Sequence, residues 1–360
     1  MRRRIVVYGA TGRVGRLVSE ELAGSSGVLL AARDPSVERT GAALELPVAV
    51  TDIAGLAGVL QPGDVLVNLA GPFDLSGDTV VSTAITSQVT YLDAAVEPAF
   101  LDRLHRDQGP AAVRARVTLL PSIGVAALVG HLVAHEAVVA AAGDARSVAV
   151  AYLSVAGLDV DEEAGRRALV RALTRDTVAY RGGRRVHEPV ARRRRTVQAG
   201  GHRHDVVSLG GAEVWSLPGL HPELEEVEVL TGALGILGPG LAVLTTPIAP
   251  HLTWPLRLGA VEGLVDRAAA LAPGVGLGGR ERAVTRVVAQ VAGADGQPLS
   301  RREAVGGDPV LVTARLAAAS AIRVAERDLR DLPVGVTDPM AVLGVDGVAD
   351  MCSWAGVVVM

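Results

Sequence analysis

Three glycines near the start of the chain constrain its fold more than any other feature. Gly9, Gly12 and Gly15 lie in the segment Gly-Ala-Thr-Gly-Arg-Val-Gly, after an apolar run at 4–8 and before apolar residues at helical spacing. Glycines at this spacing permit a tight strand-to-helix turn, close approach of the main chain to a phosphate, and close packing of the helix on the strand. The segment therefore predicts a strand–turn–helix unit whose exposed N–H groups bind a diphosphate.

Apolar runs and helical spacing alternate through the first third of the chain. Further strands are predicted at 28–32, 47–50, 64–70, 90–94 and 117–120. Because these runs are apolar almost throughout, they are typical of parallel strands covered on both faces by helices. We therefore expect a doubly wound parallel Rossmann sheet, which makes the fold class α/β.

The pattern changes from residue 146 onward, where apolar and polar residues alternate over longer stretches. Strands are predicted there at 147–154, 177–180, 192–197, 206–209, 226–230 and 282–292, and helices at 161–175 and 256–271. The 360 residues are enough for two domains. We expect the second to be an α+β domain with a mixed sheet.

The end of the second predicted strand bears on the choice between NAD and NADP. An NAD site places an acidic residue there to bind the ribose hydroxyls, whereas this strand ends with Arg33. A guanidinium binds a 2′-phosphate with two hydrogen bonds, and Arg13 in the glycine turn adds a second positive charge. NADP is therefore favoured, and NAD stays possible if the carboxylate of Asp34 turns toward the ribose. Asp52, after the third strand, either reaches the adenine edge or caps a helix.

The charge balance and the missing residue types exclude several functions. The formal net charge of −4 argues against a nucleic-acid partner held by a general positive field. All 35 basic residues are arginines, so a Schiff-base lysine, a phosphate-binding lysine and a Tyr-x-x-x-Lys pair are excluded. Cys352 is the single cysteine, which rules out a disulfide framework and fits a reducing compartment. With no secretory signal pattern, we expect a cytoplasmic protein.

A long uncharged stretch covers residues 229–256. Its length is sufficient to span a bilayer, but glycines and prolines interrupt it repeatedly. We interpret it as buried helices and turns at a subunit contact or an apolar substrate pocket, with peripheral membrane contact as the alternative. No integral membrane segment is expected.

Three further segments carry a recognisable pattern. Asn68-Leu-Ala-Gly-Pro-Phe73 ends the fourth predicted strand, Tyr91-Leu-Asp93 and Glu97 follow, and Gly335-Val-Thr-Asp-Pro-Met-Ala-Val-Leu-Gly344 lies near the other end. In these segments the chain resembles the saccharopine dehydrogenase-like family, which includes trans-acting enoyl reductase-like proteins. Members of that family carry Asn-x-x-Gly-Pro-Phe/Tyr, Tyr-x-Asp-x-x-Gly-Glu and Gly-Val-x-Thr-Pro-x-x-x-x-Gly. The last pattern has one extra residue here, Asp338.

The resemblance implies an NADP-linked oxidoreductase that acts on a C=N or C=C bond. It also implies a dinucleotide-binding domain that the chain leaves and later rejoins, at 1–125 and 305–360, with a substrate-binding and dimerisation domain at 126–304. For the pyrophosphate, it points to Gly9, Thr11, Gly12, Arg13, Val14 and Gly15. For the ribose phosphate it points to Arg33. For the nicotinamide ribose it points to Asn68, Ala70, Gly71, Pro72 and Phe73.

Two departures from the family pattern concern the substrate. The family's glycine before the glutamate is Val96 here, and the stretch at 122–130 lacks the carboxylate expected after the sixth strand. An amino-acid substrate of the saccharopine kind is therefore in doubt. We expect a largely apolar small molecule or acyl group, such as one from secondary metabolism.

The residues at the predicted sheet edge can also be explained by a role in the fold alone, without a ligand. Gly71 and Pro72 end a strand where ligands bind in open α/β folds, and Phe73 either flanks the nicotinamide or lies in the core. Tyr91 and Asp93 share one face of a strand and either border the ligand or order a loop.

A reduction to an amine, an alcohol or a saturated carbon needs a proton as well as a hydride. The candidate catalytic residues are Tyr91, Asp93, Glu97 and His131, with water as another donor and a core or interface position as the alternative for His131. The rival functions are a redox-silent sensor that binds NAD(P), and a redox-neutral isomerase or cyclase. The sensor would use the second domain for protein partners, whereas the oxidoreductase is expected to bind a small-molecule substrate and to form a homodimer.

No metal site is expected. His202 and His204 share a strand face, with His187 upstream, but the adjacent Gly200 and Gly201 predict an exposed hairpin. The arginine run at 192–195 is interpreted as a solvated face or anion contact rather than a nucleic-acid site.

Overall fold

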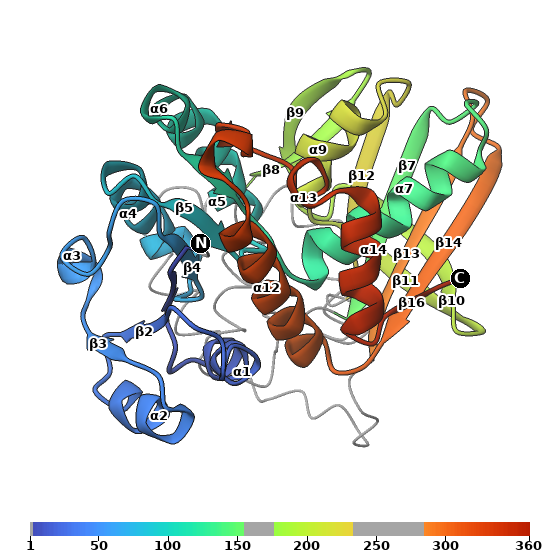
Figure 1. The fold of residues 1–360 in the computed structure, drawn as a ribbon. Helices are drawn as coiled ribbons and strands as arrows, with labels where there is room; N and C mark the ends of the chain where they lie inside the picture. The colour runs from blue at the N-terminus through green and yellow to red at the C-terminus, as the bar shows by residue number, and fades with distance from the viewer. Residues whose placement is uncertain (1–2, 155–175, 233–283) are drawn as a thin grey trace, which may run out of the picture. The chain divides into compact units, whose positions relative to one another are not determined.

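A computed structural model describes residues 3–154, 176–232 and 284–360 (Figure 1). The predicted helices at 161–175 and 256–271, and most of the uncharged stretch at 229–256, lie outside the described residues. The chain forms two compact units: Met1–Val96, Phe100–Leu128 and Val310–Gly356 make the first, and Glu97–Ala99, Val129–Pro309 and Val357–Met360 make the second. The assignment of the nucleotide to one unit and of the substrate to the other stays a prediction.

A parallel sheet forms the centre of the first unit (Figure 1). Its strands are β1 (Ile5–Tyr8), β2 (Val28–Ala32), β3 (Val48–Val50), β4 (Val65–Asn68), β5 (Thr90–Asp93), β6 (Thr118–Leu120) and β15 (Gly335–Val336). They lie in the order β15-β6-β5-β4-β1-β2-β3, and every neighbouring pair is parallel. The order runs outward in both directions from β1 and β4, which confirms the predicted doubly wound sheet.

Helices connect these strands and bury their apolar faces against them. They are α1 (Arg13–Glu21), α2 (Val37–Leu44), α3 (Ile53–Leu56), α4 (Phe73–Thr86), α5 (Pro98–Arg103), α6 (Gly109–Ala115), α12 (Pro309–Glu326), α13 (Pro339–Leu343) and α14 (Val345–Trp354). The turn between α5 and α6 is the π-helical segment Leu104–Gln108. In α1 the predicted helical spacing places Val18 in the core, fully buried, with Leu22 just beyond the helix.

The second unit contains a mixed sheet, as predicted. Its described strands are β7 (Ser147–Ser154), β8 (Asp176–Arg181), β9 (Arg184–Pro189), β10 (Arg194–Ala199), β11 (His202–Ser208), β12 (Glu226–Thr231), β13 (Thr285–Ala292), β14 (Pro298–Gly306) and β16 (Val358–Val359). The main path is β10-β11-β12-β7-β13-β14-β16, and β8 pairs with β12 and β9. Only β12 and β7 pair in parallel among these described strands.

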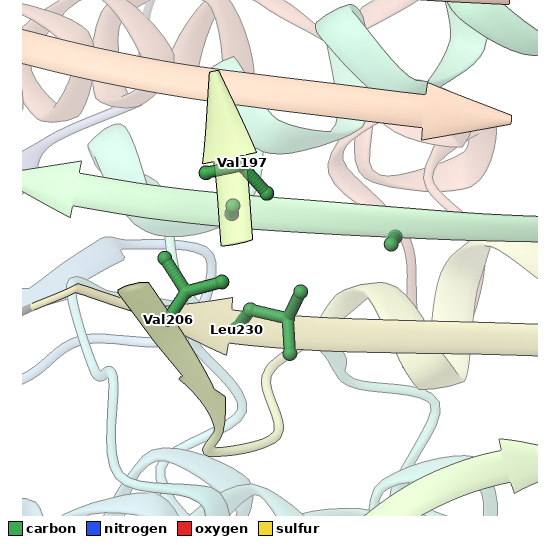
Figure 2. Close-up of a cluster of buried hydrophobic side chains, with 5 residues drawn as sticks. Val197, Val206 and Leu230 are labelled. Carbon is green, nitrogen blue, oxygen red and sulfur yellow. The ribbon is translucent and has the colours of Figure 1, made fainter. Parts of the chain in front are cut away.

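The two faces of the second sheet are covered by different elements. Helices α7 (Gly130–Ala140) and α9 (Glu213–Leu220) pack on the side to which Tyr152 points. Since side chains alternate along a strand, Ala149 and Ala151 face the other way. There they join Val197, Val206 and Leu230 in a buried apolar cluster, formed where the β10–β11 hairpin lies over the sheet (Figure 2).

Beside this cluster lies a groove of about 560 Å³. It is lined by Arg195, Glu226, Glu228 and Arg301 together with uncharged residues of β7, β13 and β14. Arg195 Nε lies 2.5 Å from Glu228 Oε2, and Arg301 is paired with Glu303. Both arginines of the groove are therefore already paired with carboxylates.

No helix among the described residues is both long enough and apolar enough to cross a lipid bilayer.

Candidate functional site

In the glycine turn, main-chain atoms approach Gly9 and Gly15 too closely for any side chain, as the glycine spacing predicted. Gly9 has a φ of +89°, and a Cβ there would lie 2.7 Å from the main-chain nitrogen of Ala70. A Cβ on Gly15 would lie 2.1 Å from the Gly9 carbonyl oxygen, so α1 packs on the turn at a distance that only glycine allows. Both positions exclude a side chain for reasons internal to the fold.

The start of α1 combines an exposed glycine with main-chain N–H groups that no described side chain caps. Gly12 is the N-cap residue and is exposed, and within residues 3–154 no side chain caps it and no acidic residue lies in the first turn of α1. The first N–H groups of a helix have no intrahelical acceptor and carry a partial positive charge. Arg13 is exposed, and Thr11 and Val14 are partly exposed beside these N–H groups. This corner is therefore suited to an anion.

Arg33 lies exposed directly after β2, at the same edge of the sheet. Burial and the Asp52 carboxylate raise the pKa of Tyr8, whereas the positive charge of Arg33 opposes that rise. Tyr8 ends β1, so these interactions bring Arg33 and Asp52 near the first strand end. Asp34 instead accepts a hydrogen bond from the Ser36 N–H at 2.8 Å, which lowers the pKa of Asp34 and holds its carboxylate in a local turn.

Asp52 caps a helix, which is one of the two roles that the sequence offered for it. It is the N-cap of α3, and its Oδ1 accepts the Gly55 N–H at 3.0 Å. Whether the same side chain also contacts a cofactor stays a prediction.

The segment after β4 turns sharply into α4. Asn68 is fully buried, Gly71 and Pro72 are exposed, and their peptide bond is cis. Phe73 is the first residue of α4 and is only 7% exposed, with its ring centroid 5.7 Å from that of Phe100. The structure thus places Phe73 in the core, as its structural interpretation describes, and a contact with the nicotinamide stays a prediction.

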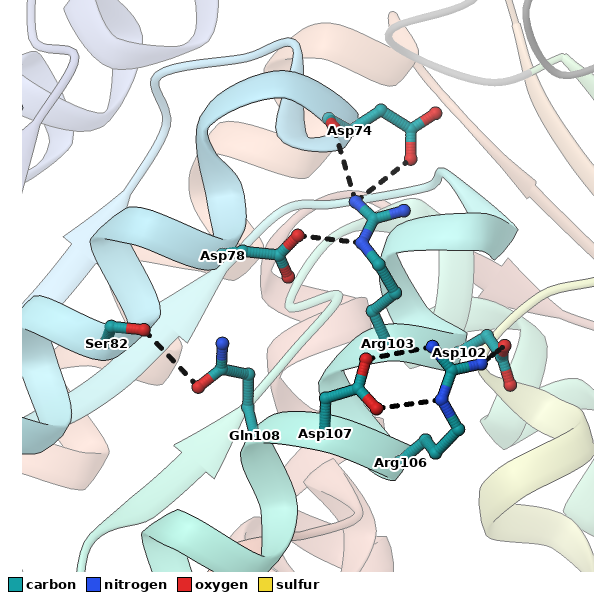
Figure 3. A network of polar contacts seen from close by, with 8 residues as sticks. All are labelled: Asp74, Asp78, Ser82, Asp102, Arg103, Arg106, Asp107 and Gln108. Carbon is teal, nitrogen blue, oxygen red and sulfur yellow. Dashed lines mark hydrogen bonds and ion pairs between the residues drawn. The ribbon is translucent and has the colours of Figure 1, made fainter.

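An arginine that the sequence analysis did not single out holds the first turn of α4 (Figure 3). Arg103 Nε donates to Asp78 Oδ2 at 2.7 Å, and Arg103 Nη2 donates to the Asp74 carbonyl oxygen at 3.2 Å. The Arg103 side chain is 23% exposed, whereas Arg106, which pairs with Asp102 and Asp107, is 57% exposed. Arg103 therefore fixes the helix that follows the Gly-Pro turn.

Tyr91 and Asp93 are brought together with Asn68 in the interior. Both Tyr91 and Asp93 are fully buried, and Asn68 Nδ2 donates to the Tyr91 hydroxyl at 3.1 Å. Asp93 Oδ1 accepts the N–H groups of Ala95 at 2.9 Å and Ser122 at 2.8 Å. Burial raises the pKa of Asp93 to about 6, while hydrogen bonds from Ser122, Ala95 and the Tyr91 hydroxyl act in the opposite direction.

Glu97 and His131 belong to the second unit. Glu97 is partly exposed and lies in the loop between β5 and α5. His131 is fully buried in α7, and its Nε2 forms a hydrogen bond with Ser216 Oγ of α9. His131 therefore has the core position that the sequence analysis gave as the alternative to a catalytic role. A catalytic role for Glu97 or His131 stays a prediction.

The same two helices carry a second polar pair that the sequence did not reveal. His135 Nδ1 lies 3.0 Å from His221 Nε2, and His221 Nδ1 lies 3.5 Å from Glu223 Oε1. Burial, followed by the nearby His135, lowers the pKa of His221. The pairing joins residues 86 positions apart in the chain, which local spacing does not encode.

Two further histidines, His202 and His204, lie on the hairpin that the sequence predicted. His202 and His204 lie on β11 after the Gly200–Gly201 turn, with His202 exposed and the ring of His204 3.2 Å from the Ala199 carbonyl oxygen. His187 is exposed on β9. Among the described residues, no group of three or more His, Cys, Asp or Glu side chains is arranged to hold a metal ion.

Comparison with known proteins agrees with this geometry. Residues 5–120 match the family model described as the saccharopine dehydrogenase NADP binding domain. No curated protein matches the chain in sequence.

Three solved structures are similar to this chain, and the first of them supports the fold. Apo saccharopine dehydrogenase (L-Glu forming) of Saccharomyces cerevisiae is similar over 99% of each chain, with a TM-score of 0.59 and 15% identity. The DAP dehydrogenase of C. glutamicum covers 95% of this chain and 94% of its own, with a TM-score of 0.48 and 12% identity. An engineered D-amino acid dehydrogenase bound to NADP⁺ covers 94% and 93%, with a TM-score of 0.47 and 13% identity.

The predicted α/β fold and the predicted resemblance are thus confirmed. The matched segment runs from the first residue of β1 to the last residue of β6, so it includes the glycine turn, Arg33 and the Asn68–Phe73 segment. Residues 5–120 match the saccharopine dehydrogenase NADP binding domain, and this match supports NADP as the cofactor.

Proposed function

We propose that the protein is an NADP-dependent oxidoreductase that reduces a C=N or C=C bond of a largely apolar small molecule or acyl substrate. The observation that carries the proposal is the corner between β1 and α1. There, Gly9 and Gly15 close the turn, Gly12 is exposed, and no side chain of the described residues caps the start of α1. Such a corner binds the diphosphate of a dinucleotide.

The residues around this corner fit NADP better than NAD. Arg33 is exposed after β2, where a guanidinium binds a 2′-phosphate, while the Asp34 carboxylate is held by the Ser36 N–H. A carboxylate in that local turn is not directed to the ribose hydroxyls that an NAD site binds. We assign Gly9, Thr11, Gly12, Arg13, Val14 and Gly15 to the diphosphate and Arg33 to the 2′-phosphate.

The nicotinamide end is assigned to the segment after β4. Ala70, Gly71 and Pro72 follow the strand next to β1 at the carboxyl edge of the sheet, and Gly71 and Pro72 are exposed. NADPH supplies a hydride when it is bound. The protein's own part is to hold the nicotinamide ribose against this turn and to exclude water from it.

A reduction of this kind also needs a proton. Of the candidate donors, Tyr91, Asp93 and His131 are fully buried and hydrogen-bonded, whereas Glu97 is partly exposed. A carboxyl group with access to solvent can regain its proton after each turnover. We therefore favour Glu97, or a water molecule, as the donor.

The substrate class rests on what the chain lacks. The stretch at 122–130 offers no carboxylate to bind an amino group, and the uncharged residues at 229–256 favour an apolar ligand. We further propose a homodimer that acts in the cytoplasm, in a pathway of secondary metabolism. A single cysteine, Cys352, which is buried, fits the reducing compartment.

Titration with NADPH followed by turnover tests the proposal. The purified protein is expected to bind NADPH and to oxidise it with at least one member of a panel of imines and enoyl thioesters. NADPH binding without oxidation by any member of the panel would favour the redox-silent sensor. Conversion of a substrate without a net change in NADPH would favour an isomerase or cyclase.

A further inference from the structure

Buried hydrogen bonds join three strand ends in the first unit. At the end of β4, Asn68 uses its Oδ1 to accept the Ala70 N–H at 3.1 Å and its Nδ2 to donate to the Tyr91 hydroxyl at 3.1 Å. Asp93, at the end of β5, lies on the same face of the strand as Tyr91, and the Tyr91 hydroxyl is near enough to its carboxylate to lower the pKa of Asp93. Asn68 and Asp93 are also register partners in the two adjacent strands.

The chain of hydrogen bonds continues to the residues after β6. Asp93 Oδ1 accepts the Ser122 N–H at 2.8 Å, and Ser122 Oγ donates to the Ala95 carbonyl oxygen at 2.8 Å. Ser122 has a φ of +60°, a conformation that costs a non-glycine residue roughly 1–2 kcal/mol. The Ile123 N–H donates to the Asp93 carbonyl oxygen at 2.7 Å. Asp93 thus holds Ser122 through its side chain and the next residue, Ile123, through its main chain.

The other end of the same chain reaches the cofactor corner. Ala70, which Asn68 fixes, lies against Gly9, where a Cβ would be 2.7 Å from the Ala70 nitrogen. Contacts this close leave no room for the Ala70–Pro72 turn to shift independently of the glycine turn. One continuous path of contacts therefore runs from Ser122 through Asp93, Tyr91 and Asn68 to the first glycine.

We infer that Asn68, Tyr91 and Asp93 are positioning residues that fix the Ala70–Pro72 turn and the Ser122 turn as one unit. This inference rests on the proposed function for its link to NADP. Tyr91 and Asp93 then serve cofactor geometry rather than proton transfer to the substrate. Their complete burial agrees with this role, because a proton donor must reach a reacting atom.

The first test is amide hydrogen exchange in the protein without ligand. Tyr91→Phe removes only the hydroxyl that accepts a hydrogen bond from the Asn68 side chain and lies beside the Asp93 carboxylate. We expect exchange at Ala70 and at Ser122 to speed up together by about five- to tenfold, since a lost hydrogen bond is worth about 1 kcal/mol. Tyr180→Phe, at a half-buried tyrosine of the second unit, is the matched control and leaves both amides unchanged. Faster exchange at neither amide, or at one alone, would overturn the inference.

The second test separates the two ends of the cofactor. Asp93→Ala is expected to weaken NADPH binding about tenfold and to change binding of 2′,5′-ADP, which lacks the nicotinamide, by less than about twofold. Asp93→Asn keeps an oxygen that accepts both N–H groups, so its affinity for NADPH stays within about threefold of wild type. If Asp93→Ala does not fold, Tyr91→Phe takes its place. It is then expected to weaken NADPH binding more than 2′,5′-ADP binding, by a smaller factor than Asp93→Ala.

The outcomes also distinguish this inference from the proposed function. Equal losses for NADPH and 2′,5′-ADP would show a general structural role and overturn the positioning role. A wild-type protein that binds neither compound would contradict the proposed function, and the exchange rates at Ala70 and Ser122 would still decide whether the two turns act as one unit.

Discussion

A Cβ atom on Gly15 would lie 2.1 Å from the carbonyl oxygen of Gly9, whereas a Cβ on Gly12 would lie 3.3 Å from the same atom. The first distance is impossible for real atoms, and the second requires only a small adjustment. Gly15 is buried and Gly12 is exposed. The two glycines therefore differ in role: Gly15 lets α1 pack on the turn, whereas Gly12, we propose, leaves room for the cofactor.

Substitutions at these two glycines should separate stability from binding. Gly15→Ala is expected to lower the free energy of unfolding by about 1–3 kcal/mol, as overpacking does in other proteins, and to weaken NADPH binding as well. Gly12→Ala should cost less than about 1 kcal/mol, since the site is exposed, and should still weaken NADPH binding. Gly12→Val should abolish binding. Urea unfolding and fluorescence titration measure the two effects, and equal losses of stability at both positions would contradict this assignment.

Arg33 should determine the preference for NADPH over NADH. Arg33→Ala removes a charge-assisted contact to the 2′-phosphate, so NADPH affinity is expected to fall by about 10- to 100-fold and NADH affinity by less than about threefold. Arg114→Ala, at another exposed arginine of the first unit, is the control and should change neither affinity. Equal losses for both nucleotides after Arg33→Ala would remove the assignment of this residue.

Arg103 and Arg106 form a matched pair of arginines on neighbouring turns (Figure 3). Arg103→Gln breaks the contacts with Asp78 and with the Asp74 carbonyl oxygen. We expect a loss of about 1–2 kcal/mol in stability and weaker NADPH binding, because the first turn of α4 follows the Gly-Pro segment. Arg106→Gln breaks exposed ion pairs and should cost less than about 0.5 kcal/mol. A larger effect from Arg106→Gln would contradict the role of Arg103.

The His135–His221 pair should make stability depend on pH. Burial and then His135 lower the pKa of His221, so near pH 6 the unfolded chain binds more protons than the folded one. The contribution of His221 is therefore fully present above the ordinary histidine pKa of about 6.5 and is lost as the pH falls through the lower folded pKa. Melting temperatures measured from pH 8 to pH 5 should fall less in His221→Gln than in the wild type. Parallel curves for the two proteins would contradict this account.

The features that were predictable from the sequence are those with a local cause. The glycine turn, the six strands of the first third and the β10–β11 hairpin each follow from spacing and turn residues within a short segment. The mixed sheet was predicted as well, but β9, β14 and β16 were missed, as was β15 of the first sheet. On β14, Arg301 and Glu303 alternate with other polar residues, so its pattern shows no apolar face. Glu303 is buried because Arg286 and Arg301 neutralise it across the sheet.

For the candidate site, the sequence predicted which residues take part but not which contacts they make. Asn68, Tyr91 and Asp93 were singled out from motifs, but the hydrogen bond from Ser122 to Asp93 spans 29 residues. Ser122 has a left-handed backbone that nothing in the local sequence signals, since serine rarely adopts it. Such contacts arise only when parallel strands bring their carboxyl ends to one edge, so they belong to the topology and not to any single segment.

The crystal structure of the protein with NADPH tests the central claim most directly. The account predicts that the diphosphate oxygens lie within hydrogen-bond distance of the N–H groups at Gly12–Val14, with the Arg33 guanidinium on the 2′-phosphate and the nicotinamide ribose beside Ala70–Pro72. A complex in which NADPH binds elsewhere, or a crystal soaked to saturation in which no nucleotide lies between β1 and α1, would contradict it.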